Sequence, residues 1–295
     1  MALIASPTAE TCRSIGRYEL GPLLGEGATG IVHRAYDPLM DRSVAIKSVK
    51  TQALTKAEIE TAFAQFAHEA RIAGKYMHRN IVAIYDVIEF AGSSHMVMEY
   101  VAGRGVDEYV KSLGPMRVQM ALNIAYRCAD ALAYVHYHGV IHRDVKPGNI
   151  MYHHASDVVK LMDFSIAEEI DRPGARGAGT LAYMAPEHFD AARRITALTD
   201  IFALGATLYR MLTARFPWKR EDTARQIVEV EPPSVALFRD DIPREVVWLV
   251  ETAMAKDERD RFSSAARFAR AIANVAAECY PDEPIGARDE PHLDL

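Results

Sequence analysis

Residues 142–149 read His-Arg-Asp-Val-Lys-Pro-Gly-Asn, and this stretch decides the fold. In order, it supplies a carboxylate at Asp144, an ammonium group at Lys146 and an amide at Asn149. A second carboxylate follows at Asp163, in the triplet Asp-Phe-Ser. Phosphoryl transfer needs a carboxylate that orients a hydroxyl, a cation beside the phosphate and oxygen ligands for a divalent metal. The stretch therefore contains the groups for that chemistry.

This pattern resembles the catalytic loop of the protein serine/threonine kinases at every functional position. The resemblance implies that Asp144 orients the substrate hydroxyl and that Lys146 lies beside the γ-phosphate of ATP. It also implies that Asn149 and Asp163 bind Mg²⁺ or Mn²⁺. A lysine two residues after the aspartate is typical of serine/threonine kinases rather than tyrosine kinases. One residue departs from the family: Ser165 stands where a glycine is usual.

Ser165 affects the backbone more than the metal ligands. Glycine adopts positive φ readily, whereas a serine forced there would cost roughly 1–2 kcal/mol. We expect Ser165 to bias the triplet against flipping without abolishing magnesium binding. The preceding residue, Phe164, is expected to pack beneath the helix that carries Glu69, together with His142.

A glycine-spaced segment at residues 25–30 lies between two predicted strands. Its glycines would let a hairpin lie flat over a polyphosphate with its amides exposed. A dinucleotide-binding fold would need a helix directly after this segment, and a strand follows instead. The strand context favours the kinase form of the loop. The residues assigned to nucleotide binding here are Gly25, Glu26, Gly27, Ala28, Thr29, Gly30 and Val32.

Val-Ala-Ile-Lys at residues 44–47 resembles the strand whose lysine contacts the α- and β-phosphates. Taken alone, Lys47 would more simply be a solvated strand residue. Glu69, on a predicted amphipathic helix, changes this interpretation, because such a glutamate pairs with the lysine in the family.

Residues 96–101, Met-Val-Met-Glu-Tyr-Val, resemble the hinge that presents main-chain groups to adenine. By this match Met98 lines the back of the adenine pocket, and Glu99 and Val101 offer main-chain hydrogen bonds. Apolar contact with the ring would come from Val32, Ala45 and Met151, although any core would use such residues.

Residues 179–187 resemble the substrate-docking end of a kinase activation segment. We expect Thr180 to position Asp144 and Lys146 rather than to be a regulatory phosphosite. Two structural roles follow from the family pattern: Glu187 pairs with Arg261, and Asp200 holds the backbone of the catalytic loop.

Residues 166–179 contain no Ser, Thr or Tyr. Nevertheless Arg143 precedes the catalytic aspartate, as in kinases that activation-loop phosphate switches on. We predict no phosphorylation between 166 and 179. The activation segment would then be ordered by Glu168, Glu169 or Asp171 near Arg143, or by an activating protein partner, in place of a phosphate.

The hydrophobic pattern predicts a β-rich half followed by an α-rich half, which is an α+β, two-lobed kinase fold. We expect tails at 1–16 and 281–295, an N-lobe at 17–100 and a C-lobe at 101–280. Strands are expected at 18–24, 30–36, 43–49, 81–90 and 94–100. Helices are expected at 55–77, 105–113, 116–138, 196–213, 221–229, 243–254 and 263–278.

Composition excludes several classes of partner. A net charge of -6 argues against binding to nucleic acid or an anionic membrane, since both need clustered positive surface. No window has the roughly 18 apolar residues that a membrane helix needs, and the N-terminus lacks a signal peptide. Three scattered cysteines indicate a reducing compartment, so we expect a cytoplasmic protein. The resemblance to the kinases implies protein substrates with Ser or Thr acceptors.

Other constellations carry less weight. The pairs His136/His138 and His153/His154 lack a third partner at convergent spacing, so they are weak metal-site candidates. Trp218 and Trp248 are interpreted as core or packing residues.

Two alternatives remain beside the enzyme. A pseudokinase that binds nucleotide and acts as a scaffold is favoured only by Ser165 and by the segment without acceptors. A small-molecule kinase is disfavoured by the docking segment that ends in Ala-Pro-Glu. Gly148 stands where kinases selective for basic substrates often carry glutamate, which argues against a strict arginine requirement.

Overall fold

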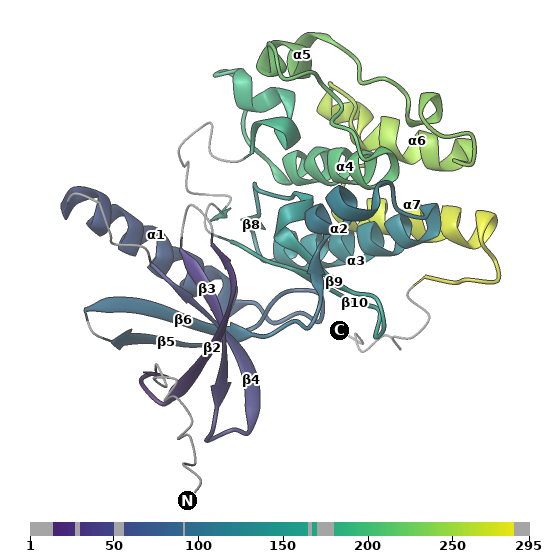
Figure 1. Ribbon diagram of the computed structural model, residues 1–295. Helices are drawn as coiled ribbons and strands as arrows, with labels where there is room; N and C mark the ends of the chain where they lie inside the picture. The colour runs from purple at the N-terminus through teal and green to yellow at the C-terminus, as the bar shows by residue number, and fades with distance from the viewer. Residues whose placement is uncertain are drawn as a thin grey trace, which may run out of the picture. The chain divides into compact units, whose positions relative to one another are not determined.

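The computed structural model describes residues 14–26, 30–49, 56–90, 92–164, 167–169 and 180–285 (Figure 1). Its internal contacts divide the chain into two compact units. The first comprises Met1–Ala70 and Ala83–Tyr100, and the second comprises Arg71–Val82 and Val101–Leu295. The sheet-rich first unit and the helical second unit confirm the α+β, two-lobed plan.

The first unit is built on a six-stranded antiparallel sheet in the order β1-β2-β3-β4-β6-β5 (Figure 1). Its helix α1 (Lys56–Lys75) continues into the second unit. The strands are β1 (Ser14–Ile15), β2 (Tyr18–Glu26), β3 (Ile31–Asp37), β4 (Arg42–Ser48), β5 (Ile84–Phe90) and β6 (Ser93–Glu99).

Strand β4 is the centre of this sheet. Its residues from Val44 to Lys47 are buried without alternation, which means that both faces of the strand are covered. Val44 and Ile46 join a cluster with Tyr18 and Val97. The opposite phase of the strand carries Ala45 and Lys47, so the alternation of a strand places the lysine side chain away from that apolar cluster.

The strand expected at 81–90 begins later, at Ile84. The backbone of the preceding residues pairs elsewhere: Leu161 donates to the Asn80 carbonyl at 2.7 Å and accepts from the Val82 amide at 3.0 Å. These bonds place residues 80–82 in the second unit.

In the second unit, α4 is the central helix, and it lies between α3 and α6 (Figure 1). Every residue from Thr199 to Thr213 is buried, as expected of a largely apolar helix that is covered on all sides. A Cβ on Gly205 would lie 2.7 Å from the Ala253 Cβ, so glycine is needed for this close packing. The helices are α2 (Val106–Leu113), α3 (Val118–Tyr137), α4 (Ala197–Thr213), α5 (Thr223–Glu229), α6 (Arg244–Ala253) and α7 (Ala265–Cys279).

Two small sheets frame the catalytic loop. Strand β9 (Ile150–His153) and strand β10 (Val158–Leu161) form an antiparallel hairpin, with β7 (Arg104–Gly105) paired to β9. Strand β8 (Val140–Ile141) pairs with β11 (Glu168–Glu169). The sequence indicated only a turn at the hairpin, because its strands are four residues each and carry little periodic signal.

Residues 281–285, assigned by sequence to a tail, lie along the start of α3. The Arg117 guanidinium contacts the Glu283 carboxylate at 3.1 Å, and Gln119 donates to the Glu283 carbonyl at 2.6 Å.

Candidate active site

In the first unit, Lys47 on β4 and Glu69 on α1 form a buried ion pair. The Lys47 ammonium lies 2.8 and 2.7 Å from the two Glu69 carboxylate oxygens. Their side chains are 9% and 8% exposed. The predicted pair is therefore brought together within one unit.

The β2–β3 hairpin contains part of the predicted phosphate loop. Gly25 and Glu26 end β2, and Gly30 precedes β3, whereas Gly27, Ala28 and Thr29 lie outside the described residues. A Cβ on Gly30 would lie 2.5 Å from the Ser48 carbonyl oxygen, so the neighbouring strand β4 requires glycine there. On the same pair of strands, Val32 lies opposite Lys47 in register.

Strands β4 and β6 bring further predicted nucleotide contacts together. Ala45 is the register partner of Met98 and is buried. The Glu99 amide already donates to the Ala83 carbonyl at 2.9 Å. In the second unit, the Val101 carbonyl accepts from the Gly103 amide at 2.8 Å, and Met151 lies half-buried on β9.

In the second unit, Asp200 holds the catalytic loop by its backbone. Thr196 caps α4 by accepting from the Leu198 amide, which places Asp200 in the first turn. The Asp200 carboxylate accepts the His142 amide and the Arg143 amide, each at 2.8 Å. Burial alone would raise the pKa of Asp200, but the hydrogen bond from His136 and the nearby donors hold the pKa below its ordinary value. Asp200 thus remains an anionic acceptor for the loop.

This support maintains a strained backbone. Arg143 has a φ of 68°, a left-handed conformation that a non-glycine residue adopts at a cost of about 1–3 kcal/mol. His142 adds a second connection, since its Nε2 lies 3.1 Å from the Met162 carbonyl and its ring packs on Phe164 at 4.6 Å. The start of the loop between β8 and β9 is therefore held by two separate segments, α4 and residues 162–164.

Three polar side chains converge on Asp144. Lys146 Nζ lies 2.5 Å from Oδ2, and Asn149 Nδ2 donates to the same oxygen at 2.9 Å. Oδ1 accepts the amide and the hydroxyl of Thr180, both at 3.1 Å. Lys146 also donates to Thr180 Oγ1 at 2.7 Å. The structure brings Asp144, Lys146, Asn149 and Thr180 into one hydrogen-bonded network.

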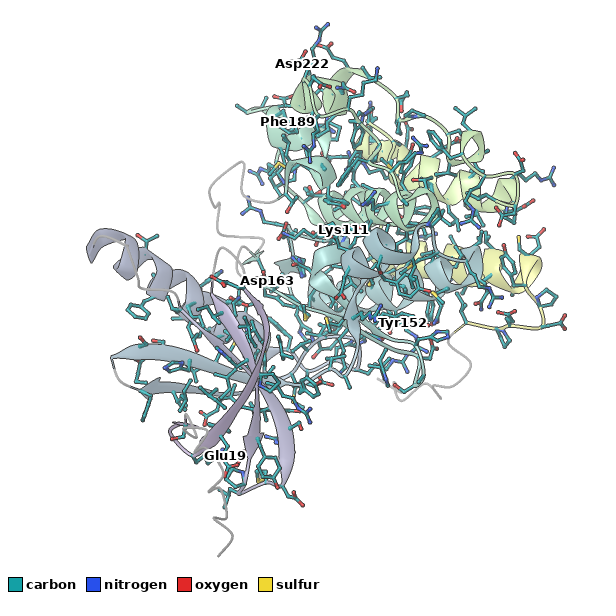
Figure 2. The ribbon with its side chains drawn as sticks, in the orientation of Figure 1. Glu19, Lys111, Tyr152, Asp163, Phe189 and Asp222 are labelled. Carbon is teal, nitrogen blue, oxygen red and sulfur yellow. The ribbon has the colours of Figure 1, made fainter. Side chains whose placement is uncertain are left out.

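Asn149 and Asp163 suit a hard divalent cation. The amide nitrogen of Asn149 makes two hydrogen bonds to Asp144, while its Oδ1 makes none with the residues that the structure describes. The Asn149 carbonyl accepts the Met162 amide at 2.8 Å, which ties the residue before Asp163 to Asn149. Asp163 follows the end of β10 with φ of 63° (Figure 2). An amide oxygen and a carboxylate are ligands that magnesium prefers.

The docking segment rests on a buried ion pair. Arg261 donates to both oxygens of Glu187, at 2.8 and 2.9 Å, and Thr199 donates to one of them at 2.8 Å. Neither ion-pair side chain is exposed. Burial acts to raise the pKa of Glu187, but the Arg261 guanidinium lowers it below the ordinary value.

The histidine pairs have other partners. His136 Nε2 lies 2.8 Å from Asp200, and His138 packs against the Tyr134 ring. His153 contacts Ser156, and His154 contacts Tyr152. Within the described ranges, no three His, Cys, Asp or Glu side chains are grouped to hold a metal. Sequence reasoning missed the contact of His136 with Asp200, because the two residues are far apart along the chain.

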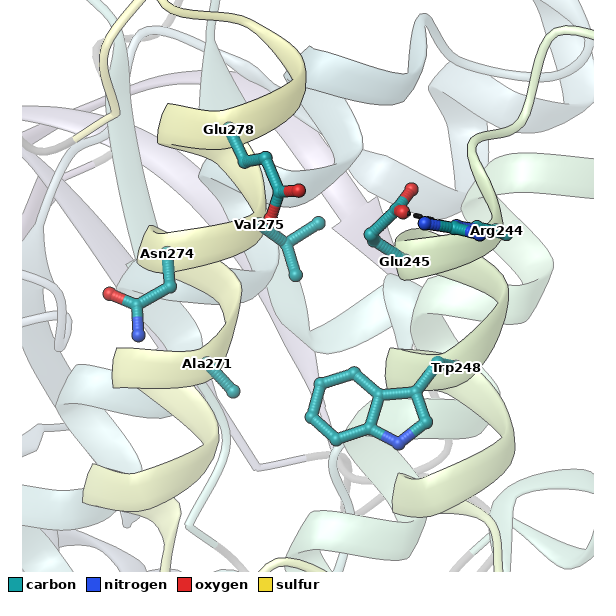
Figure 3. Close-up of a pocket in the computed structure, with 7 residues that line it drawn as sticks. All are labelled: Arg244, Glu245, Trp248, Ala271, Asn274, Val275 and Glu278. Carbon is teal, nitrogen blue, oxygen red and sulfur yellow. Dashed lines mark hydrogen bonds and ion pairs between the residues drawn. The ribbon is translucent and has the colours of Figure 1, made fainter.

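A groove of about 480 Å³ between α6 and α7 contains no predicted site residue (Figure 3). Trp248 lines it with half of its surface exposed and packs edge-on against Phe262 at 5.5 Å. Trp218, in contrast, is buried and stacks on Phe202.

Comparison with known proteins agrees with this geometry. The protein kinase domain family matches residues 18–274. The serine/threonine-protein kinase PrkC of Bacillus subtilis (strain 168) is 33% identical over 86% of this chain and 39% of its own length. PksC of Streptomyces coelicolor is 35% identical over 91% of this chain and 50% of its own length. PknB of Mycobacterium tuberculosis (strain ATCC 25177 / H37Ra) is 33% identical over 91% of this chain and 44% of its own length.

The chain spans about two fifths to one half of the length of these curated relatives. In the part that the structure describes, no helix has both the length and the apolar character to cross a bilayer. The family match and the relatives show that the chain belongs to the protein kinase family, and within it to the serine/threonine protein kinases of the bacterial type.

Proposed function

We propose that this chain transfers the γ-phosphate of ATP to serine and threonine hydroxyls of protein substrates, with Mg²⁺ as the metal. The observation that carries the proposal is the network around Asp144. Its carboxylate is buried and oriented by Lys146, Asn149 and Thr180. Such a base is suited to orient one incoming hydroxyl, and this is the main requirement of a reaction governed by positioning.

The proton and the phosphoryl group move in opposite directions. The acceptor hydroxyl donates a hydrogen bond to Asp144, and its oxygen attacks the γ-phosphorus. As the new O–P bond forms, the bond from the γ-phosphorus to the β–γ bridging oxygen breaks, and ADP leaves with that electron pair. The hydroxyl proton passes to Asp144. The Lys146 ammonium, adjacent to Asp144, stabilises the negative charge of the transferring group.

Nucleotide binding is proposed for residues of both units. Lys47 would contact the α- and β-phosphates, with Glu69 fixing its ammonium. Because the Glu99 amide is already bonded to Ala83, the hinge contact proposed for Glu99 falls to its carbonyl. The Val101 amide would supply the second hinge contact. The phosphate loop (Gly25, Glu26, Gly27, Ala28, Thr29 and Gly30) and the apolar residues Val32, Ala45, Met98 and Met151 complete the proposed nucleotide site.

Asn149 Oδ1 and the Asp163 carboxylate would hold the divalent ion. When bound, the ion would supply charge neutralisation at the β- and γ-phosphate oxygens. These two ligands leave coordination positions for phosphate oxygens and water, as magnesium requires. The same oxygen ligands suit Mn²⁺, so Mn²⁺ stays an alternative to Mg²⁺, and a metal titration compares the two.

We further propose a cytoplasmic kinase that is not activated by phosphorylation within 166–179. The cytoplasmic location is supported by the need for ATP and by Cys128, whose buried thiol forms no disulfide with the other cysteine that the structure describes. The proposal that phosphorylation within 166–179 does not activate the kinase is supported by the lack of hydroxyl residues in that segment. A protein partner would then supply the ordering contact.

The test is incubation with labelled ATP and Mg²⁺, with the chain and a generic protein as acceptors. We expect label on the generic acceptor with the wild type and loss of at least a thousandfold in Asp144→Asn. The matched control is Asp240→Asn, which neutralises an exposed carboxylate elsewhere in the second unit. Equal labelling by wild type and Asp144→Asn would contradict the assigned base. Nucleotide binding without transfer by the wild type would favour the scaffold.

A further inference from the structure

Arg210, on the last turn of α4, is a buried cation that has no acidic partner among the residues described by the structure. The residue is 8% exposed. No carboxylate among the residues that the structure describes lies within ion-pair distance of it. Its Nη1 donates to the Ala214 carbonyl, while its Nε is buried and has no hydrogen bond to the part of the chain that the structure describes. A guanidinium has five N–H donors, so the Ala214 contact satisfies a small part of its capacity.

A purely structural role leaves this arrangement incompletely explained. A cation at the C-terminal end of a helix interacts favourably with the helix dipole. That effect accounts for the contact with Ala214, which ends α4 in a left-handed turn with φ of 55°. It does not provide an acceptor for the buried Nε. Desolvating a charge without a counterion is costly, and proteins usually pair such groups.

Arg210 is close to the segment that follows Thr180. Its guanidinium carbon lies 4.6 Å from the centre of the Phe216 ring, and that ring contacts Tyr183 at 6.2 Å. Tyr183 ends the short 3-10 helix Leu181–Tyr183, which begins directly after Thr180. Burial raises the pKa of Tyr183, and the charge of Arg210 opposes this increase. A chain of contacts thus connects the cation to the residue that touches Asp144.

The surface beside this cation is open. Leu181 and Phe216 are 44% and 45% exposed. One carboxylate, Asp107 on α2, is close enough to Tyr183 for its charge to raise the pKa of the Tyr183 hydroxyl. Asp107 is engaged by Lys111, labelled in Figure 2, at 2.7 Å. A second cation, Arg215, lies on the loop after α4 and packs on Phe238.

We propose that Arg210 is a specificity residue that recognises an anionic side chain of the protein substrate near the phosphorylated hydroxyl. This inference rests on the proposed function, because it concerns the acceptor side of the same site. The ligand class is an oxyanion, either the carboxylate of Asp or Glu or the phosphate of an already phosphorylated residue. A planar guanidinium suits both.

The test compares peptides with one acceptor serine and with Glu, phosphoserine, Ala or Arg scanned through the flanking positions. We expect kcat/KM for the best acidic peptide to exceed that for its alanine counterpart by roughly 10- to 100-fold, the range for a hydrogen bond to a charged group. Arg210→Gln, which keeps a donor for Ala214, should remove this ratio. Arg210→Glu should favour the arginine peptide. Arg215→Gln is the matched control and should keep the wild-type ratio.

A preference for the phosphoserine peptide alone assigns the site to phosphate. A preference for both the Glu and the phosphoserine peptides assigns it to any oxyanion, and either result supports the inference. The same acidic-to-alanine ratio in wild type and Arg210→Gln overturns it, as does a wild-type ratio of one. Thermal unfolding shows whether each variant is folded. Fluorescence anisotropy of labelled peptides with the serine replaced by alanine measures the same ratio as affinity. If the wild type phosphorylates no peptide, the proposed function fails, and this binding ratio still decides the role of Arg210.

Discussion

Two hydrogen bonds join Thr180 to Asp144: the amide and the hydroxyl of Thr180 both donate to Oδ1 at 3.1 Å. A hydroxyl in this position fixes one carboxylate oxygen, while Lys146 and Asn149 contact the other. A phosphate on Thr180 would replace that donor with negative charge beside a carboxylate. The geometry therefore favours a positioning role for Thr180 over a regulatory phosphosite.

Thr180→Val should lower kcat by roughly 10- to 100-fold, because it removes one hydrogen bond to a charged group. Thr180→Ser keeps the hydroxyl and should retain most of the activity. Steady-state kinetics with one peptide substrate measures both. Mass spectrometry that finds Thr180 phosphorylated, together with activity that requires this phosphate, would contradict the positioning role.

Asp200→Asn should disorder the catalytic loop. The carboxylate accepts two main-chain amides, and an asparagine offers one acceptor oxygen and a donor in place of the other. Each buried donor left unsatisfied costs about 1–3 kcal/mol. We expect the free energy of unfolding to fall by about that amount and kcat to fall with it. Urea denaturation measures the first, with the exposed Asp240→Asn as control; unchanged stability would show that the amides find other acceptors.

The helices and most strands could be predicted from sequence because their patterns are local. The buried stripe of α3 and the largely apolar α4 follow from hydrophobic spacing along one segment. The β9–β10 hairpin was missed as an element because four-residue strands give almost no period. The expected strand 81–90 included Ile81, because the segment is rich in β-prone residues. That composition cannot reveal that the backbone of residues 80–82 pairs with Leu161 instead.

In the candidate site, too, residues that share a local motif could be predicted, and a residue defined by distant contacts could not. Asp144, Lys146 and Asn149 were predicted because one short loop carries all three. Arg210 was not, because its importance depends on the left-handed turn at Ala214 that brings Phe216 against it. No local pattern encodes that an arginine at a helix end has no acidic neighbour within the described ranges of the chain.

The Lys47–Glu69 pair provides a test that separates stability from activity. Lys47→Met leaves a buried carboxylate without its cation, and such a loss costs about 3–5 kcal/mol. Lys47→Met with Glu69→Leu removes both charges and should recover much of the stability. Neither variant should transfer phosphate. Denaturation curves and the labelled-ATP assay report the two quantities; a double variant as unstable as the single one would show that the pair is not coupled.

Ser165 remains a prediction, since it lies outside the described residues. Within the described part of the triplet, the left-handed backbone is at Asp163, with φ of 63°. A serine two residues later is compatible with catalysis if its own φ stays negative. Ser165→Gly should therefore change phosphotransfer by less than about threefold, a difference below 1 kcal/mol. A much larger increase in kcat would contradict the expectation that Ser165 only biases the triplet against flipping.

The Glu187–Arg261 pair should make stability depend on pH in acid. The Arg261 hydrogen bonds lower the pKa of Glu187 in the folded chain, against the effect of burial. A lowered folded pKa contributes stability that is fully present above the unfolded value, about 4.3 for glutamate, and is lost as pH falls through the folded pKa. The test measures the free energy of unfolding of the wild type and of Glu187→Gln at a series of pH values between about pH 7 and pH 3. The difference between the two proteins isolates the contribution of Glu187 from that of the other carboxylates. We expect the difference to be constant near neutrality and to shrink below about pH 4.3. A difference that stayed constant to pH 3 would show that the pKa of Glu187 is the same in the folded and unfolded chain.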